Sequence, residues 1–247
     1  MRSLVYKTEG EGFPLLFLHG FLEDLRMWEF LPTSHLKFKK IFLDLPGHGS
    51  STILEGTPSI TAIAGLIINE LKQLGIDKFH VVGHSMGGYV ALELAKFGVV
   101  EKIVLLNSNF WEDSAQKKKD RDRVVSIVKT SKDLFIKEGI KSLFAQPGCY
   151  ENEILTLVDY AKKYPVEGIV YATLAMKNRL NHQKVCTELG TKLLVIQGEN
   201  DESTPLQIMK VLLPKENQLY LIPGIGHMSY IESPELVIQK LETFFAE

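Results

Sequence analysis

The sequence predicts an α/β protein built on a doubly wound, mostly parallel sheet. Short apolar runs alternate along the chain with segments in which apolar residues recur at helical spacing, as over residues 60–74. Several runs, such as residues 14–18, are apolar throughout, as expected of strands buried on both faces of a parallel sheet. Strands that alternate with helices imply right-handed crossovers.

The apolar runs give the expected strands in chain order. The first is an edge strand over residues 4–8, and the others cover residues 14–18, 41–43, 79–83, 103–106, 193–197 and 219–222. The helical patterns fall at residues 25–31, 60–74, from about 89 to 97, 205–212 and 234–245. For the helix over 60–74, Thr57 is the expected cap, with Pro58 in the first turn and Gly75 at the end.

A sharp turn joins the strand at 79–83 to the helix that follows it. Ser85 lies at the bend, with Gly83 and Gly87 two residues away on each side, which matches the G-x-S-x-G nucleophile elbow. A side chain at either glycine would clash where strand and helix converge. The turn places the Ser85 hydroxyl at the amino end of a helix, where free N–H groups favour developing negative charge.

The alternation breaks over residues 108–188. No comparably apolar strand occurs there, and helical pieces are expected at 114–130, 140–145, 151–164 and 168–176. We interpret 108–188 as a helical lid inserted within a single domain, residues 1–247. Its basic run, residues 117–123, is interpreted as a solvated helix face, with anion recognition as the alternative.

Composition narrows the class of protein. The 247 residues are 45% hydrophobic and 23% charged, which is ordinary for a globular protein with a sizeable core. A net charge of −2 gives no long-range attraction to nucleic acid or membranes, and no apolar run approaches a membrane span. The amino terminus lacks a signal-peptide pattern, and Cys149 and Cys186 have no metal spacing, so we expect reduced thiols and a cytoplasmic protein without metal or cofactor.

Three chemically complementary residues follow three different expected strands. Ser85, Asp201 and His227 each lie just past a strand, and the carboxyl ends of parallel strands share one edge, where ligands bind. Glu199 and Glu202 are rivals for Asp201 on position alone.

The chain resembles the α/β-hydrolase fold family, in its small, single-domain, lid-bearing form. The resemblance covers nearly the whole length and rests on His19-Gly20, the loop at 44–51, the elbow at 83–88, Gly198-x-x-Asp201 and Gly226-His227. It implies a helical cap inserted after the sixth strand.

The resemblance also implies roles for the site residues. Ser85 would be the nucleophile, His227 the general base and Asp201 the residue that orients the imidazole. The backbone N–H groups of Met86 and Phe21 would form the oxyanion hole.

Residues beside this machinery complete the expected site. Leu22, Trp111 and Met228 are expected to contact substrate, with packing as the alternative for Trp111. His84 is expected to pack, and His19 to brace the oxyanion loop.

Hydrolysis of a small carboxylic ester, or a thioester, is the expected reaction, on a small-molecule substrate and with the oligomeric state left open. A lyase of menaquinone synthesis, 2-succinyl-6-hydroxy-2,4-cyclohexadiene-1-carboxylate synthase, is the first alternative. That family usually carries an arginine where this chain has Tyr89, although residues 117–123 offer other cations. A ligand receptor with little turnover is the second alternative.

Overall fold

The fold is an α/β sandwich around a single twisted sheet. The computed structural model describes residues 4–213, 215 and 218–246, and within them seven strands form one sheet of order β1-β3-β2-β4-β5-β6-β7. The strands are β1 (Tyr6–Glu9), β2 (Pro14–Leu18), β3 (Lys39–Leu43), β4 (Phe79–His84), β5 (Val100–Leu106), β6 (Leu193–Gly198) and β7 (Leu219–Ile222). Only β1 runs antiparallel, to β3, so the sheet is mostly parallel, as predicted.

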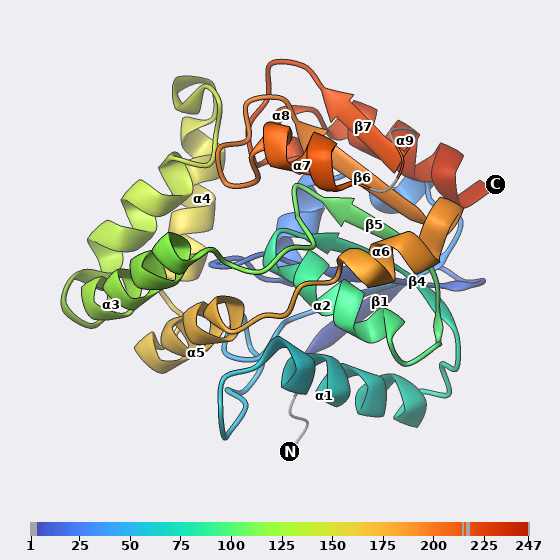
Figure 1. Cartoon of the computed structure of the whole chain (residues 1–247), viewed down its shortest axis with the longest axis horizontal. Helices are drawn as coiled ribbons and strands as arrows, with labels where there is room; N and C mark the ends of the chain where they lie inside the picture. The colour runs from blue at the N-terminus through green and yellow to red at the C-terminus, as the bar shows by residue number, and fades with distance from the viewer. Residues whose placement is uncertain (1–3, 214, 216–217, 247) are drawn as a thin grey trace.

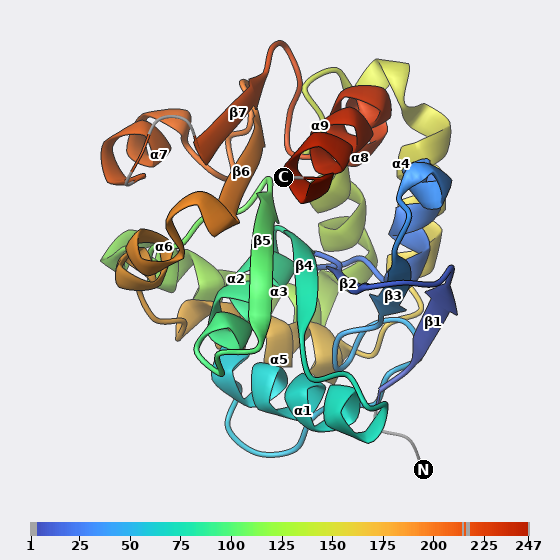
Figure 2. The ribbon, with the colours of Figure 1, turned by 90° about the vertical axis from the view of Figure 1, so that its right-hand side faces the viewer.

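Helices cover both faces of this sheet (Figures 1 and 2). They are α1 (Ile60–Gln73), α2 (Met86–Ala95), α3 (Ala115–Lys141), α4 (Glu151–Ala161), α5 (Val166–Lys177), α6 (Gln183–Leu189), α7 (Leu206–Leu212), α8 (Ser229–Glu232) and α9 (Pro234–Ala246). The segment expected as a helix around Trp28 is a 3-10 helix, Leu25–Phe30.

Alternate residues of each strand feed two separate cores. In β2, Leu16 and Leu18 pack in a cluster with α1 and α2, whereas Leu15 and Phe17 pack in a second cluster with α8 and α9. Because successive side chains of a strand point to opposite faces, a strand that is apolar throughout serves both cores. This explains the continuous apolar runs in the sequence.

The start of α1 differs from the expected cap. Ser59, not Thr57, is the N-cap: its side chain accepts a hydrogen bond from the backbone N–H of Ala62. Ser59 has the extended backbone that an N-cap needs and lies directly before the first helical residue, so its hydroxyl reaches a free N–H of the first turn.

Four helices, α3 to α6, lie in the chain between β5 and β6. Figure 1 shows α3, α4 and α5 grouped on one side of the sheet, with α6 beside α2. These helices follow the fifth strand of the chain, and not the sixth as the resemblance implies. The count is one lower because, among the described residues, β1 is the edge of the sheet and no further strand lies beyond it. The helix α3 covers the piece expected at 114–130, with a kink at Ser131, and ends at Lys141, so residues 142–145 of the piece expected at 140–145 are not helical.

A buried ion pair ties α2 to the segment that enters α6. Glu93 is 1% exposed and contacts His182 Nε2 at 2.8 Å and Lys96 Nζ at 3.0 Å. Burial alone would raise the pKa of Glu93, but the hydrogen bonds from His182 and Lys96 lower it from 4.5 to about 2. Because the folded-state pKa lies below the unfolded one, this stabilisation is complete above pH 4.5 and is lost as pH falls toward 2.

Substituting Glu93 should therefore cost stability in a pH-dependent way. We expect Glu93→Gln to lower the free energy of unfolding by about 1–3 kcal/mol at neutral pH. Urea titrations at several pH values should show that the difference in unfolding free energy between the variant and the wild type shrinks as pH falls from 4.5 toward 2. Glu242→Gln, on an exposed residue of α9, is the control. A Glu93→Gln penalty that stays constant into acid would contradict the assigned ion pair.

None of the helices in the described residues combines the length and apolar character required to cross a bilayer.

Candidate active site

Ser85 lies in the sharp turn between β4 and α2. Its backbone, at φ +48° and ψ −113°, is in a strained region that few residues with a side chain adopt. A Cβ at Gly83 would lie 2.5 Å from the Gly87 carbonyl, and a Cβ at Gly87 would lie 2.2 Å from the carbonyl oxygen of Leu18. Only glycine fits at these close approaches, which explains why glycine lies two residues before and two residues after Ser85.

The contact of Gly87 with Leu18 gives a direct test of this turn. We expect Gly87→Ala to lower the free energy of unfolding by about 3 kcal/mol or more, because the added methyl group must displace the end of β2. Gly65→Ala is the matched control: its Cβ would meet nothing within 4 Å inside α1, and it should stabilise the protein by roughly 0.5–1 kcal/mol. Urea unfolding measures both, and equal stability of Gly87→Ala and the wild type would refute the close approach.

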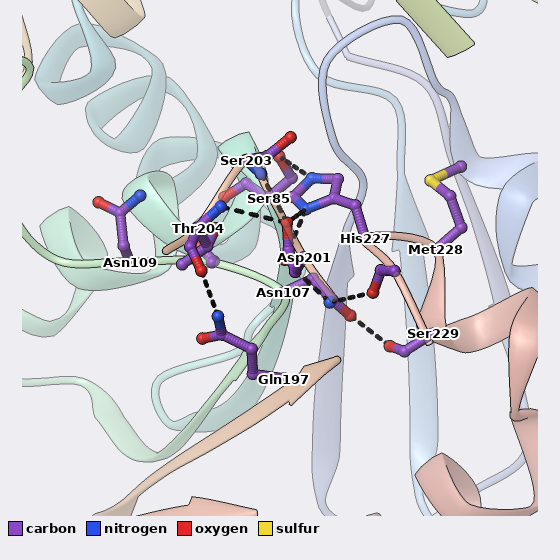
Figure 3. Close-up of polar contacts among 12 residues, drawn as sticks. Ser85, Asn107, Asn109, Gln197, Asp201, Ser203, Thr204, His227, Met228 and Ser229 are labelled. Carbon is purple, nitrogen blue, oxygen red and sulfur yellow. Dashed lines mark hydrogen bonds and ion pairs between the residues drawn. The ribbon is translucent and has the colours of Figure 1, made fainter. Parts of the chain in front are cut away.

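The structure brings Ser85, Asp201 and His227 together at the carboxyl edge of the sheet (Figure 3). The Ser85 hydroxyl lies 2.9 Å from His227 Nε2. On the other side of the ring, His227 Nδ1 lies 2.9 Å and 2.8 Å from the two carboxylate oxygens of Asp201. Asp201 follows β6 and His227 follows β7, so three strands position a chain of hydrogen bonds that no local sequence contains.

Asp201 is held ionised by its surroundings. Burial alone would raise its pKa, but contact with His227 and a hydrogen bond from Asn107 hold the pKa below its usual value. Backbone N–H groups of Ser203 and Thr204 also donate to Oδ1, at 2.9 Å and 3.1 Å. The carboxylate therefore stays negative and can stabilise a positive charge on the imidazole.

The two rivals of Asp201 lie apart from the imidazole. Glu199 is exposed and accepts a hydrogen bond from the backbone N–H of Gly224 at 3.1 Å. Glu202 is also exposed, and among the described residues neither carboxylate contacts His227. Of the three acidic residues in this loop, the structure places only Asp201 against the ring.

Asn107 is a site residue that sequence reasoning missed. It follows β5, and its Nδ2 donates to Asp201 Oδ2 at 3.1 Å and to the Gly226 carbonyl at 3.0 Å, while Ser229 donates to its Oδ1. Asn107 thus links the loops after β6 and β7 and fixes the carboxylate relative to the ring. The signal in the sequence is a polar residue directly after an apolar strand, and the structure gives this residue a φ of +46°.

The loop after β2 is fixed by a second polar cluster. Glu23, which sequence reasoning also missed, is buried and accepts from the Gly20 N–H at 2.6 Å and the Tyr230 hydroxyl at 2.9 Å, and its Oε2 lies 2.8 Å from His84 Nδ1. The other ring nitrogen of His84 lies 3.0 Å from the carbonyl of His227. Burial alone would lower the pKa of His84, but Glu23 holds it above its usual value. Both ring nitrogens of His84 have hydrogen-bond partners, so this side chain connects the loop after β2 with the loop after β7.

His19 holds the same loop from its other side. Its Nε2 accepts from the Leu45 N–H at 2.8 Å, so its Nδ1 carries the proton and donates to the Gly20 carbonyl at 2.7 Å. Because β2 pairs with β4, with Leu18 opposite Gly83, the loop that carries Phe21 lies beside the turn that carries Ser85. Met86 is the first residue of α2, where backbone N–H groups have no partner within the helix.

A cavity of about 800 Å³ opens over Ser85 and His227. Phe21, Leu22 and Trp111 line it, and substrate contact by Leu22 and Trp111 stays a prediction. Met228 does not: its side chain is fully buried in the core with α8 and α9, because the chain turns inward after His227 (Figure 3). The expectation that Met228 contacts substrate is corrected accordingly.

A metal site requires several side chains that can bind the ion to lie close together. Among the described residues, no group of three or more His, Cys, Asp or Glu side chains is arranged to hold a metal ion.

Comparison with known proteins gives one family. The model of the Alpha/beta hydrolase family matches residues 15–240. The chain is similar to a thermophilic esterase from Thermogutta terrifontis, solved with malate bound, with a TM-score of 0.89 and 28% identity, covering 98% of this chain and 93% of that chain.

Curated relatives differ in what they do. The dihydrolipoyllysine-residue acetyltransferase component of the acetoin cleaving system of Pseudomonas putida is 28% identical, over 97% of this chain and 65% of the relative. The 2-succinyl-6-hydroxy-2,4-cyclohexadiene-1-carboxylate synthase of Citrobacter koseri is 23% identical, over 92% of this chain and 91% of the relative. This chain spans 65% and 62% of the first two curated relatives it matches.

Proposed function

The chain belongs to the alpha/beta hydrolase family, and on that premise we propose that it is a serine hydrolase that cleaves a small carboxylic ester through an acyl-enzyme intermediate. The observation that carries the proposal is the hydrogen-bonded series from the Ser85 hydroxyl through His227 to Asp201, with a distance of 2.9 Å between Ser85 Oγ and His227 Nε2. A serine hydroxyl is a poor nucleophile at neutral pH unless an adjacent base takes its proton.

The proposed reaction follows from these positions. Ser85 Oγ attacks the ester carbonyl as its proton passes to His227 Nε2, and His227 then gives that proton to the departing alcohol. A water molecule attacks the acyl-enzyme as its proton passes to the same nitrogen, and His227 then returns this proton to Ser85 Oγ as the acid leaves. Asp201 keeps the Nδ1–H tautomer and stabilises the imidazolium in both halves of the reaction.

The backbone N–H groups of Met86 and Phe21 are the proposed oxyanion hole. Their placement supports this, because Met86 opens α2 directly after Ser85, and Phe21 lies in the loop that Glu23 and His19 hold. A preorganised donor of this kind typically contributes on the order of 100- to 1,000-fold to turnover.

A small-molecule ester, or a thioester, is the proposed substrate class. The cavity over Ser85 has about 800 Å³, within the range of small-molecule sites, and its apolar lining includes Leu22 and Trp111. The thermophilic esterase named above is consistent with this class. As part of the same proposal we place the activity in the cytoplasm, because Cys149 and Cys186 are both free thiols.

One observation favours the lyase as a second candidate. Tyr89 stands where the menaquinone-pathway family usually has arginine, but the guanidinium of Arg179 lies over the Tyr89 ring, 4.3 Å from its centre. A cation therefore reaches this part of the cavity from the helices between β5 and β6.

Substrate assays on the wild-type protein separate the candidates. We expect rapid hydrolysis of p-nitrophenyl acetate and slow or no release of pyruvate from the menaquinone precursor. Efficient pyruvate release with poor ester turnover would select the lyase. Saturable ligand binding with no appreciable turnover of either substrate would select the receptor and reject the hydrolase.

A further inference from the structure

The cavity over Ser85 extends to a group of cations that ester hydrolysis does not use. Tyr89, one turn of α2 beyond Ser85, lines the cavity, and Arg179 packs on its ring. Lys117 and Arg121, from the first two turns of α3, line the cavity as well. Lys117 and Arg121 belong to α3, and Arg179 follows the end of α5; Figure 1 shows these two helices on the same side of the sheet.

These cations have too few anionic partners. Asp113, which is buried, contacts both guanidinium groups: Arg179 Nη1 at 2.5 Å and Arg121 Nε at 3.1 Å. One carboxylate thus serves two arginines. Lys117 is exposed and forms no ion pair within the described residues, and partial desolvation together with the charge of Arg121 lowers its pKa. The group therefore carries excess positive charge.

The other charged residues of the cavity lining leave this excess in place. Glu23 is engaged by the Gly20 N–H, His84 and the Tyr230 hydroxyl. Lys118 and Glu112 pair with each other at 3.2 Å. Glu202, in the exposed loop after β6, contacts none of the cations among the described residues. A bound anion would supply the missing negative charge.

An unsatisfied polar group lies beside the cations. Asn109 lines the cavity and is only 3% exposed, yet just one end of its amide has a partner, the Tyr89 hydroxyl at 3.2 Å. Figure 3 shows this amide apart from the hydrogen bonds around Asp201. Its Nδ2 donates to the Tyr89 hydroxyl, so the end without a partner among the described residues is the Oδ1 oxygen, which accepts from a donor group of a ligand and does not bind a carboxylate.

We propose that Lys117 and Arg121 form a carboxylate-binding subsite, so that the preferred substrate is a monoester of a dicarboxylic acid. Asp113, which also pairs with Arg179, holds Arg121 through its Nε, and the remaining N–H groups of Arg121 are available to a ligand. The inference rests on the proposed ester hydrolysis and specifies its substrate. It also assigns the basic run at 117–123 a role that a solvated helix face does not have.

The test compares charged and neutral esters of the same shape. Monoethyl esters of the dicarboxylic acids from succinic to suberic are assayed against analogues in which a carboxamide replaces the free carboxylate. At the best chain length we expect kcat/KM to favour the anionic ester by about tenfold or more, the usual effect of a hydrogen bond to a charged group. The ratio cancels any general change in activity.

Three variants locate the effect. Lys117→Met and Arg121→Gln should each bring the ratio close to unity, and Lys117→Glu should reverse the preference. Lys119→Met is the matched control, since Lys119 is exposed on the same helix and does not line the cavity, and it should leave the ratio unchanged. Equal turnover of charged and neutral esters by the wild type, or equal losses in Lys117→Met and Lys119→Met, would overturn the subsite while leaving ester hydrolysis intact.

A binding measurement keeps the subsite testable if no ester is hydrolysed. By calorimetry we expect the wild type to bind one or more of the free dicarboxylates from succinate to suberate, and Lys117→Met to bind about tenfold more weakly. Absence of binding to the wild type, or binding that Lys117→Met does not weaken, would overturn the subsite whatever the outcome of the assays.

Discussion

Replacing Ser85 with alanine should lower kcat for p-nitrophenyl acetate hydrolysis by about a million-fold, the loss found when the nucleophile of such a triad is removed. The hydroxyl that lies 2.9 Å from His227 Nε2 is gone, and no covalent intermediate can form. The variant should fold normally, because the Ser85 side chain makes no hydrogen bond other than that to His227 in the described residues. Stopped-flow or initial-rate assays, with circular dichroism to check folding, measure the effect.

Ser142→Ala is the control for this loss. Ser142 also lines the cavity, but its hydroxyl donates to the Gly139 carbonyl at 2.8 Å, so its removal should leave turnover unchanged. A folded Ser85→Ala protein with more than a few per cent of wild-type activity would refute the proposed acyl-enzyme.

Asp201→Asn should lower kcat by about ten thousand-fold without changing the shape of the site. Asparagine can donate to Nδ1, which favours the tautomer with the proton on Nε2, and that nitrogen then cannot accept the Ser85 proton. The imidazolium also loses the carboxylate whose pKa the site holds low. The same ester assay, with thermal unfolding as a check, measures this variant.

Glu202→Gln separates this effect from a general loss of negative charge. Glu202 is the next residue, exposed and on the cavity lining, and its substitution should change kcat by no more than a few-fold. Comparable losses in the two variants would contradict the assignment of Asp201 as the residue that orients His227.

The strands and most helices could be predicted because their signals are local. A strand such as Pro14–Leu18 is apolar throughout since it is buried on both faces, and the spacing in α1 follows from one buried stripe. The positions of Ser85, Asp201 and His227 could be predicted for a topological reason: residues after parallel strands gather at one edge.

What could not be predicted depends on contacts between distant loops. Glu23 and Asn107 carry no local pattern, and their roles appear only when the loops after β2, β5, β6 and β7 meet. Met228 was misplaced because adjacency to His227 in the chain does not fix the direction of a side chain. Within the basic run, the pairing of Arg121 with Asp113, which also binds Arg179, is a contact that the sequence alone does not show.

The lid function of residues 108–188 stays a prediction. The structure gives that segment the helices α3, α4 and α5, and residues of α3 and α5 line the cavity together with residues of the sheet loops. A lid would have to move relative to those loops.

Labelling with a fluorophosphonate, followed by peptide mass spectrometry, tests most directly whether the Ser85 oxygen is activated by His227. The account predicts a single covalent adduct on Ser85 in the wild type, formed much faster than in the Asp201→Asn variant and absent in Ser85→Ala. A wild-type protein that stays unlabelled, or an adduct on another serine, would contradict it.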